Sequence, residues 1–140
     1  GVVISLALKA SQNTITNVAA FIQKAALCAL TNSDVKAAVR VMYARYGQRR
    51  DNALRMLGEE GSHIGAFAPK GAFYVFIDIR DMGFPSLTIA ERLLAEAKIS
   101  MVPGSVYGSC GEGYLRMTLA ASDKAIEQGI SGLIKWANSL

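Results

Sequence analysis

Residues 72–79 alternate between two sets of side chains along the chain. One face carries Phe73, Val75, Ile77 and Ile79, and the other carries Ala72, Tyr74, Phe76 and Asp78. A period of two, rich in aromatic and β-branched residues, is typical of a β-strand. This segment is therefore predicted to be the best-defined strand of the chain.

The segments around this strand predict a mixed order of helices and strands. Apolar residues at helical spacing predict a buried helix over 14–30 and a second helix from the Thr31–Asp34 interruption to about residue 60. Ser86 and Ser122 are predicted to cap two later helices, and 99–102 and 114–119 are predicted strands. This order predicts an α+β fold, with a small, largely antiparallel sheet and helices packed on one face. Residues 34–140 would form this domain, and residues 1–33 would belong to another.

Composition limits the possible functions. The chain has 140 residues, 51% of them hydrophobic, and no apolar run long enough to predict a membrane span. Its 15 basic and 11 acidic residues are scattered, which does not favour nucleic-acid binding. Two cysteines without a disulfide pattern predict a reducing, cytoplasmic location, with Cys28 in the core. His63 is the single histidine, so no metal site is predicted.

Arg116 is the position that most suggests a function. It lies in the predicted strand 114–119 on the face opposite Leu115, Met117 and Leu119. A guanidinium group binds a carboxylate through two parallel hydrogen bonds, and a strand would hold it in place for this purpose. The pattern by itself favours a solvated arginine on the outer face of a sheet.

Other polar segments have simpler interpretations. The glycines of 104–113 match neither the dinucleotide nor the P-loop pattern, so a mobile turn between strands is favoured over a phosphate site. Arg49, Arg50 and Asp51 are interpreted as a solvated helix face or a local ion pair. Cys110 has no neighbouring histidine or cluster of cations that would activate a thiol.

Five segments taken together resemble a known family. They are Gln-Lys-Ala-Ala-Leu at 23–27, Arg-Arg-Asp at 49–51, Pro-Lys-Gly-Ala-Phe-Tyr-Val-Phe at 69–76, Val-Pro-Gly at 102–104 and Gly-Glu-Gly-Tyr-Leu-Arg-Met-Thr-Leu-Ala at 111–120. Their order and spacing resemble the C-terminal part of class I/II aminotransferases. These enzymes are the aspartate aminotransferase-like branch of the fold-type-I enzymes that use pyridoxal 5'-phosphate (PLP).

The resemblance implies roles for particular residues. Arg116 would bind the α-carboxylate of an amino-acid or 2-oxo-acid substrate. Thr14, Thr16 and Asn17 would lie near the cofactor phosphate of the partner subunit in a homodimer, although Val18 stands where the family usually has proline. Residues 1–33 would be a remnant of the large PLP-binding domain, and 34–140 would be the C-terminal small domain.

The lysine that such enzymes join to PLP has no counterpart in this chain. None of the seven lysines lies in the family's Ser-x-x-Lys context followed by Gly-x-Arg; they are Lys9, Lys24, Lys36, Lys70, Lys98, Lys124 and Lys135. The aspartate that pairs with the pyridine nitrogen and the glycine-rich anion loop are also absent. The chain alone is therefore predicted to be inactive. The alternatives are a part of a fold-type-I lyase or synthase, and a non-catalytic ligand-binding or dimerisation module.

Overall fold

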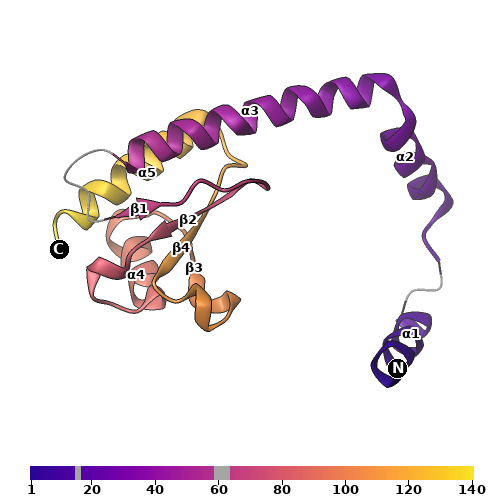
Figure 1. Cartoon of the computed structure of the whole chain (residues 1–140), viewed down its shortest axis with the longest axis horizontal. Coiled ribbons are helices and arrows are strands. Elements are labelled where there is room, and N and C mark those ends of the chain that lie inside the picture. Colours follow the sequence, from indigo (N-terminus) through magenta and orange to yellow (C-terminus); the bar gives the residue numbers. More distant parts are fainter. Residues whose placement is uncertain (15–16, 59–63) are drawn as a thin grey trace. The chain divides into compact units, whose positions relative to one another are not determined.

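A computed structural model describes residues 1–14, 17–58 and 64–140 of the chain (Figure 1). The chain divides into two compact units, Gly1–Met42 and Tyr43–Leu140. The boundary between the units falls inside the long helix α3, Ser33–Leu57.

The first unit contains α1, Val2–Thr14, α2, Ala20–Thr31, and the beginning of α3. Two predictions for this region were wrong. The predicted helix over 14–30 begins only at Ala20, and neither α1 nor α2 has a buried residue in this structure. Cys28 is exposed as well. Helical spacing shows which face of a helix could be buried, but it does not supply the surface that would cover that face.

The interruption between α2 and α3 was predicted correctly. The Asn32 side-chain oxygen accepts hydrogen bonds from the backbone N–H groups of Asp34 at 2.7 Å and Val35 at 3.4 Å. These bonds satisfy donors that have no partner within the first turn of a helix. The predicted end of the second helix near residue 60 lies outside the described residues, and α3 is described as far as Leu57.

The second unit holds the sheet. Its strands are β1, Gly65–Ala66, β2, Tyr74–Asp78, β3, Val102–Pro103, and β4, Tyr114–Thr118; its other helices are α4, Ser86–Arg92, and α5, Asp123–Ala137. The strands follow the order β1-β2-β4-β3, and each neighbouring pair is antiparallel. The predicted α+β fold with an antiparallel sheet is confirmed.

One face of the sheet forms the core of the second unit. Val75, Ile77 and Leu115 are fully buried, and the side chains that cover them come from the end of α3, from α4 and from α5. The principal covering residues are Ala53, Leu57, Ile89, Ile130 and Leu133. The prediction that helices pack on one face of the sheet is therefore confirmed.

The two predicted serine caps differ in outcome. Ser122 caps α5, because its hydroxyl oxygen accepts a hydrogen bond from the Ala125 N–H at 3.2 Å. Ser86 does not cap α4; it is the first residue of the helix, and its side chain is buried against Glu112 instead. Ser86 thus bonds the carboxylate of Glu112, 26 residues away, instead of a backbone N–H in the first turn of α4.

Candidate carboxylate-binding site

The face of the sheet opposite the core is lined by aromatic and polar side chains. Tyr74 and Phe76 of β2 and Tyr114 and Arg116 of β4 are half-buried on this face. Arg116 is paired across the sheet with Phe76 on one side and Val102 on the other. The alternation of the sequence therefore placed Arg116 on the polar face, as predicted.

The guanidinium of Arg116 lies against two tyrosine rings. Its Cζ atom is 4.1 Å from the centroid of the Tyr74 ring and 4.8 Å from that of Tyr107. Both distances are within the range of cation–π attraction. Within the described part of the chain, no carboxylate forms an ion pair with Arg116. The site therefore contains an arginine that is held by two aromatic rings and is not neutralised by any carboxylate of the described residues.

A second arginine on this side is already neutralised. The Arg80 guanidinium donates to both carboxylate oxygens of Asp78, with distances of 2.9 Å from Nε to Oδ1 and 2.5 Å from Nη2 to Oδ2. These hydrogen bonds hold the pKa of the Asp78 carboxyl below its usual value, although burial opposes the shift. The Arg80 backbone N–H also donates to Asp78 Oδ1, at 3.1 Å.

The glycine-rich segment 104–113 forms two consecutive 3₁₀ turns, Gly104–Tyr107 and Ser109–Gly111. The turns are joined at their buried ends, where a Cβ atom on Gly104 would overlap the carbonyl oxygen of Gly111 and one on Gly111 would overlap that of Gly104. Only glycine permits this approach of two backbones. The segment connects two strands as predicted, and its internal contacts give it a defined shape.

Glu112 attaches this segment to the start of α4. Its carboxylate accepts hydrogen bonds from the Ser86 N–H at 2.7 Å and the Ser86 hydroxyl at 3.0 Å, and Ser86 Oγ lies 3.1 Å from Ser105 Oγ. The bonds from the Ser86 backbone and then from its hydroxyl lower the pKa of the Glu112 carboxyl, against a smaller effect of desolvation. Sequence reasoning missed this contact, because 26 residues separate the partners.

Glu112→Gln is expected to destabilise the second unit at neutral pH and to lose this effect in acid. A carboxyl whose folded pKa is lowered stabilises the fold at pH above the unfolded value of about 4.3 and loses that contribution as the pH falls through the folded value. The measurement is urea unfolding of both proteins between pH 7 and pH 3, followed by Trp136 fluorescence. Glu91→Gln, on an exposed side chain of α4, is the matched control. A stability difference that stays constant with pH would contradict the assignment.

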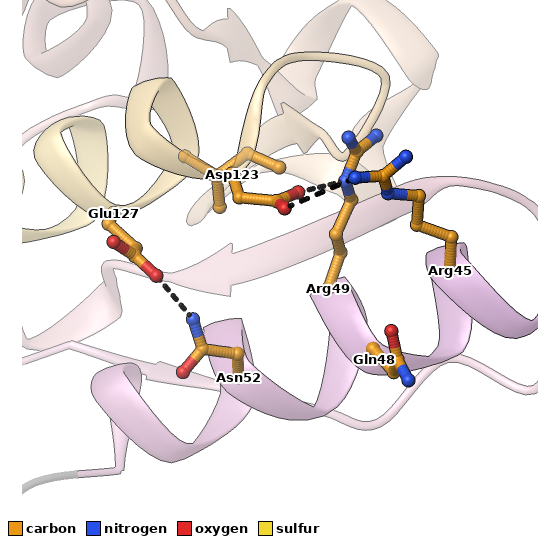
Figure 2. Close-up of a pocket in the computed structure, with 7 residues that line it drawn as sticks. Arg45, Gln48, Arg49, Asn52, Asp123 and Glu127 are labelled. Atoms are coloured by element: carbon orange, nitrogen blue, oxygen red, sulfur yellow. Dashed lines mark hydrogen bonds and ion pairs between the residues drawn. The ribbon is translucent and has the colours of Figure 1, made fainter.

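A cavity of about 170 Å³ lies between α3 and α5, lined by Arg45, Gln48, Arg49, Asn52, Asp123, Ile126 and Glu127 (Figure 2). Arg49 closes one side, because its Nε donates to Asp123 at 2.5 Å and its Nη1 donates to the Leu119 carbonyl at 3.1 Å. The bond from Arg49 holds the pKa of Asp123 below its usual range. Arg49 is therefore already paired, and its two hydrogen bonds join α3 to the start of α5 and to the residue that follows β4.

The predicted ion pair at 49–51 is confirmed only for Arg50, whose Nη2 lies 2.6 Å from Asp51. For Arg49 the prediction was wrong, since its partner Asp123 is 74 positions away. Spacing along a helix reveals neighbours on the same helix, whereas this contact depends on how α5 packs.

The residues predicted near a cofactor phosphate do not form an enclosed site in the described part of the chain. The Thr14 hydroxyl donates to the Ala10 carbonyl at 2.7 Å within α1, and Asn17 is exposed. Thr16 and His63 lie outside the described residues. Cys110 is exposed, and among the described residues no group of three or more potential ligands could hold a metal ion. No described helix is both apolar enough and long enough to cross a membrane.

Comparisons with known proteins show which class of protein has this fold. No protein-family model matches the sequence. The aromatic aminotransferase of Pyrococcus horikoshii superposes with a TM-score of 0.86 at 35% identity, over 94% of this chain and 34% of that one. Aspartate aminotransferase of Thermus thermophilus with maleate gives 0.80 at 31%, over 91% and 32%. An antiparallel sheet with helices on one face, as in this chain, is therefore a fold found in aminotransferases.

The relatives that are similar in sequence show to which branch of the aminotransferases the chain belongs. Aspartate aminotransferase of Pyrococcus abyssi is 39% identical, and aromatic-amino-acid aminotransferase 2 of Thermococcus litoralis is 38% identical; each match covers 82% of this chain. The chain spans about 29% of the length of each relative, in the C-terminal part. The chain belongs to the aspartate aminotransferase-like family, which confirms the resemblance seen in the sequence.

Proposed function

We propose that this chain is the carboxylate-binding C-terminal part of an aminotransferase, which exchanges an amino group between an α-amino acid and a 2-oxo acid with PLP. The observation that carries the proposal is Arg116, a half-buried arginine that lies against two tyrosine rings and has no ion-pair partner among the described residues. The chain is also 39% identical to an aspartate aminotransferase. Residues 34–140 would be its small domain, and residues 1–33 a part of the large domain.

Arg116 would bind and orient the substrate. Two parallel hydrogen bonds from one guanidinium to the α-carboxylate fix both the position and the rotation of that group. Binding at the carboxylate then directs the Cα–H bond toward the reacting centre, which lowers the entropic cost of reaching a reactive geometry. PLP, when bound, supplies the electron sink that makes this bond acidic.

The described residues do not fit PLP by themselves. All seven lysines are exposed, and Lys98 donates its Nζ hydrogen bond to the Ala95 carbonyl at 2.8 Å. The Thr14 hydroxyl is bonded within its own helix. The proposal therefore assigns the cofactor lysine to the part of the protein that corresponds to the other two-thirds of the relatives. It places residues 14–17 beside the partner subunit in a homodimer.

The test compares a substrate with its analogue that lacks the carboxylate. In the complete protein with its cofactor, phenylalanine and aspartate are offered as donors to 2-oxoglutarate, and 2-phenylethylamine replaces phenylalanine in a matched assay. Loss of two charge-assisted hydrogen bonds is expected to lower kcat/KM for the amine by about 100-fold or more. The 140-residue chain alone with PLP is expected to show no turnover and no borohydride-reducible visible band.

Three outcomes would contradict the proposal. Equal turnover of phenylalanine and 2-phenylethylamine would show that the protein does not recognise the substrate carboxylate. Release of ammonia or carbon dioxide without formation of glutamate from 2-oxoglutarate would indicate another PLP reaction on the same fold. Turnover by the 140-residue chain alone would show that the cofactor lysine lies within it.

A further inference from the structure

The two rings that contact Arg116 come from opposite sides of its strand. Tyr74 belongs to β2, which pairs with one edge of β4, and Tyr107 follows β3, which pairs with the other edge. The Arg116 Cζ atom is within 5 Å of both ring centroids, at 4.1 and 4.8 Å. The position of the guanidinium therefore depends on two separate segments of the fold.

Aromatic contacts hold a guanidinium without using its hydrogen-bond donors. Cation–π attraction acts between the charge and the face of a ring, whereas the five N–H donors of the group point outward in its plane. A carboxylate side chain in the same place would occupy these donors, as Asp78 does for Arg80. No carboxylate in the described part of the chain pairs with Arg116, so its donor edge stays available for an anion that arrives from outside.

Tyr107 is itself held in place, although 49% of its surface is exposed. It ends the 3₁₀ turn Gly104–Tyr107, whose buried end is fixed by the approach of Gly104 to Gly111. Its ring also meets that of Phe76 edge to face, with centroids 6.0 Å apart. An exposed aromatic side chain with these supports can restrict the rotamers of a neighbouring arginine.

We propose that Tyr107 is a positioning residue, which holds the Arg116 guanidinium in the orientation that receives the substrate carboxylate. This inference rests on the proposed function, and it goes further because it assigns a role to a residue that does not itself bind the carboxylate. Tyr107 restricts the conformations of the Arg116 side chain before the substrate arrives. Arg116 therefore loses less conformational entropy when it binds the carboxylate, and the substrate binds more tightly.

Tyr107→Leu in the complete protein with its cofactor is the variant that tests the role, because leucine keeps an apolar side chain and removes the ring. It is expected to raise KM for phenylalanine about fivefold and to leave kcat within about twofold, since a cation–π contact at a partly exposed site is a modest attraction. Kinetics with 2-phenylethylamine, which has no carboxylate, are expected to remain unchanged. Tyr107→Phe, which restores the ring, is expected to recover most of the lost affinity.

Val106→Ala is the matched control, because Val106 is exposed in the same turn and has no aromatic ring that could hold the guanidinium. Equal losses for phenylalanine and 2-phenylethylamine in Tyr107→Leu would indicate general damage to the turn and would overturn the inference. Unchanged KM would overturn it as well. If wild-type protein does not distinguish phenylalanine from 2-phenylethylamine, the proposed function has failed; if it does and Tyr107→Leu discriminates equally well, only the role of Tyr107 has failed.

Discussion

Arg116→Ala in the complete protein is expected to lower kcat/KM for α-amino acids by about 100-fold or more, with little change for amines that have no carboxylate. The reason is that each charge-assisted hydrogen bond contributes about 1.5–3 kcal/mol, and a bidentate pair loses two of them. The measurement is steady-state kinetics with phenylalanine and 2-phenylethylamine. The loss of kcat/KM should reflect substrate binding and not misfolding, because Arg116 is half-buried on the face opposite the core and its removal leaves the core intact.

Arg116→Lys is the informative companion variant. Lysine keeps the positive charge and loses the planar fork, so we expect an intermediate loss of about 10-fold in kcat/KM. Circular dichroism and the urea midpoint should remain close to those of the wild type in both variants. If Arg116→Ala has the same kinetics as the wild type, Arg116 does not bind the substrate.

Gly104→Ala is expected to destabilise the second unit by about 3 kcal/mol or more, or to prevent its folding. A Cβ atom at this position would overlap the carbonyl oxygen of Gly111 and lie 2.8 Å from that of Tyr114. Both obstacles are backbone atoms, so no side-chain rotation can relieve the overlap. Urea unfolding of the 140-residue chain, followed by Trp136 fluorescence, measures the loss, because Trp136 is the only tryptophan and is 7% exposed.

Gly129→Ala is the matched control on α5, where an added Cβ meets no atom within 4 Å apart from the nearby backbone of its own helix. Alanine in a helix interior is favoured over glycine by about 0.5–1 kcal/mol, so this variant should be slightly more stable than the wild type. Gly111→Ala should behave like Gly104→Ala, because its Cβ would meet the Gly104 carbonyl. A Gly104→Ala protein as stable as the wild type would refute the close approach of the two turns.

Local patterns predicted the elements that depend on neighbouring residues. The alternation of 72–79 and 114–119 predicted β2 and β4, and in β4 it separated Leu115 and Met117 from Arg116 on the opposite face. Ser122 was recognised at a helix start and Thr31–Asp34 at the interruption between two helices, because a capping bond spans only two or three residues. The same reasoning failed for Ser86, where the carboxylate of Glu112, 26 residues away, bonds both its amide and its hydroxyl.

The sequence patterns could not predict contacts between residues that are far apart in the sequence. Arg49 with Asp123, Glu112 with Ser86 and Tyr107 with Arg116 each join segments that come together only when the helices and turns pack. The burial predicted for α2 also failed, because amphipathic spacing describes a face and not the surface that covers it.

The sequence by itself determined the family, the two central strands β2 and β4, and the placement of Arg116 on the polar face of a strand. Each of these depends on residue type and spacing along the chain. Only the tertiary structure decided that Arg116 lies against Tyr74 and Tyr107 without an ion-pair partner among the described residues. The reason is physical: the direction of a side chain follows from its own strand, but its neighbours are set by the strands and turns that pack beside it.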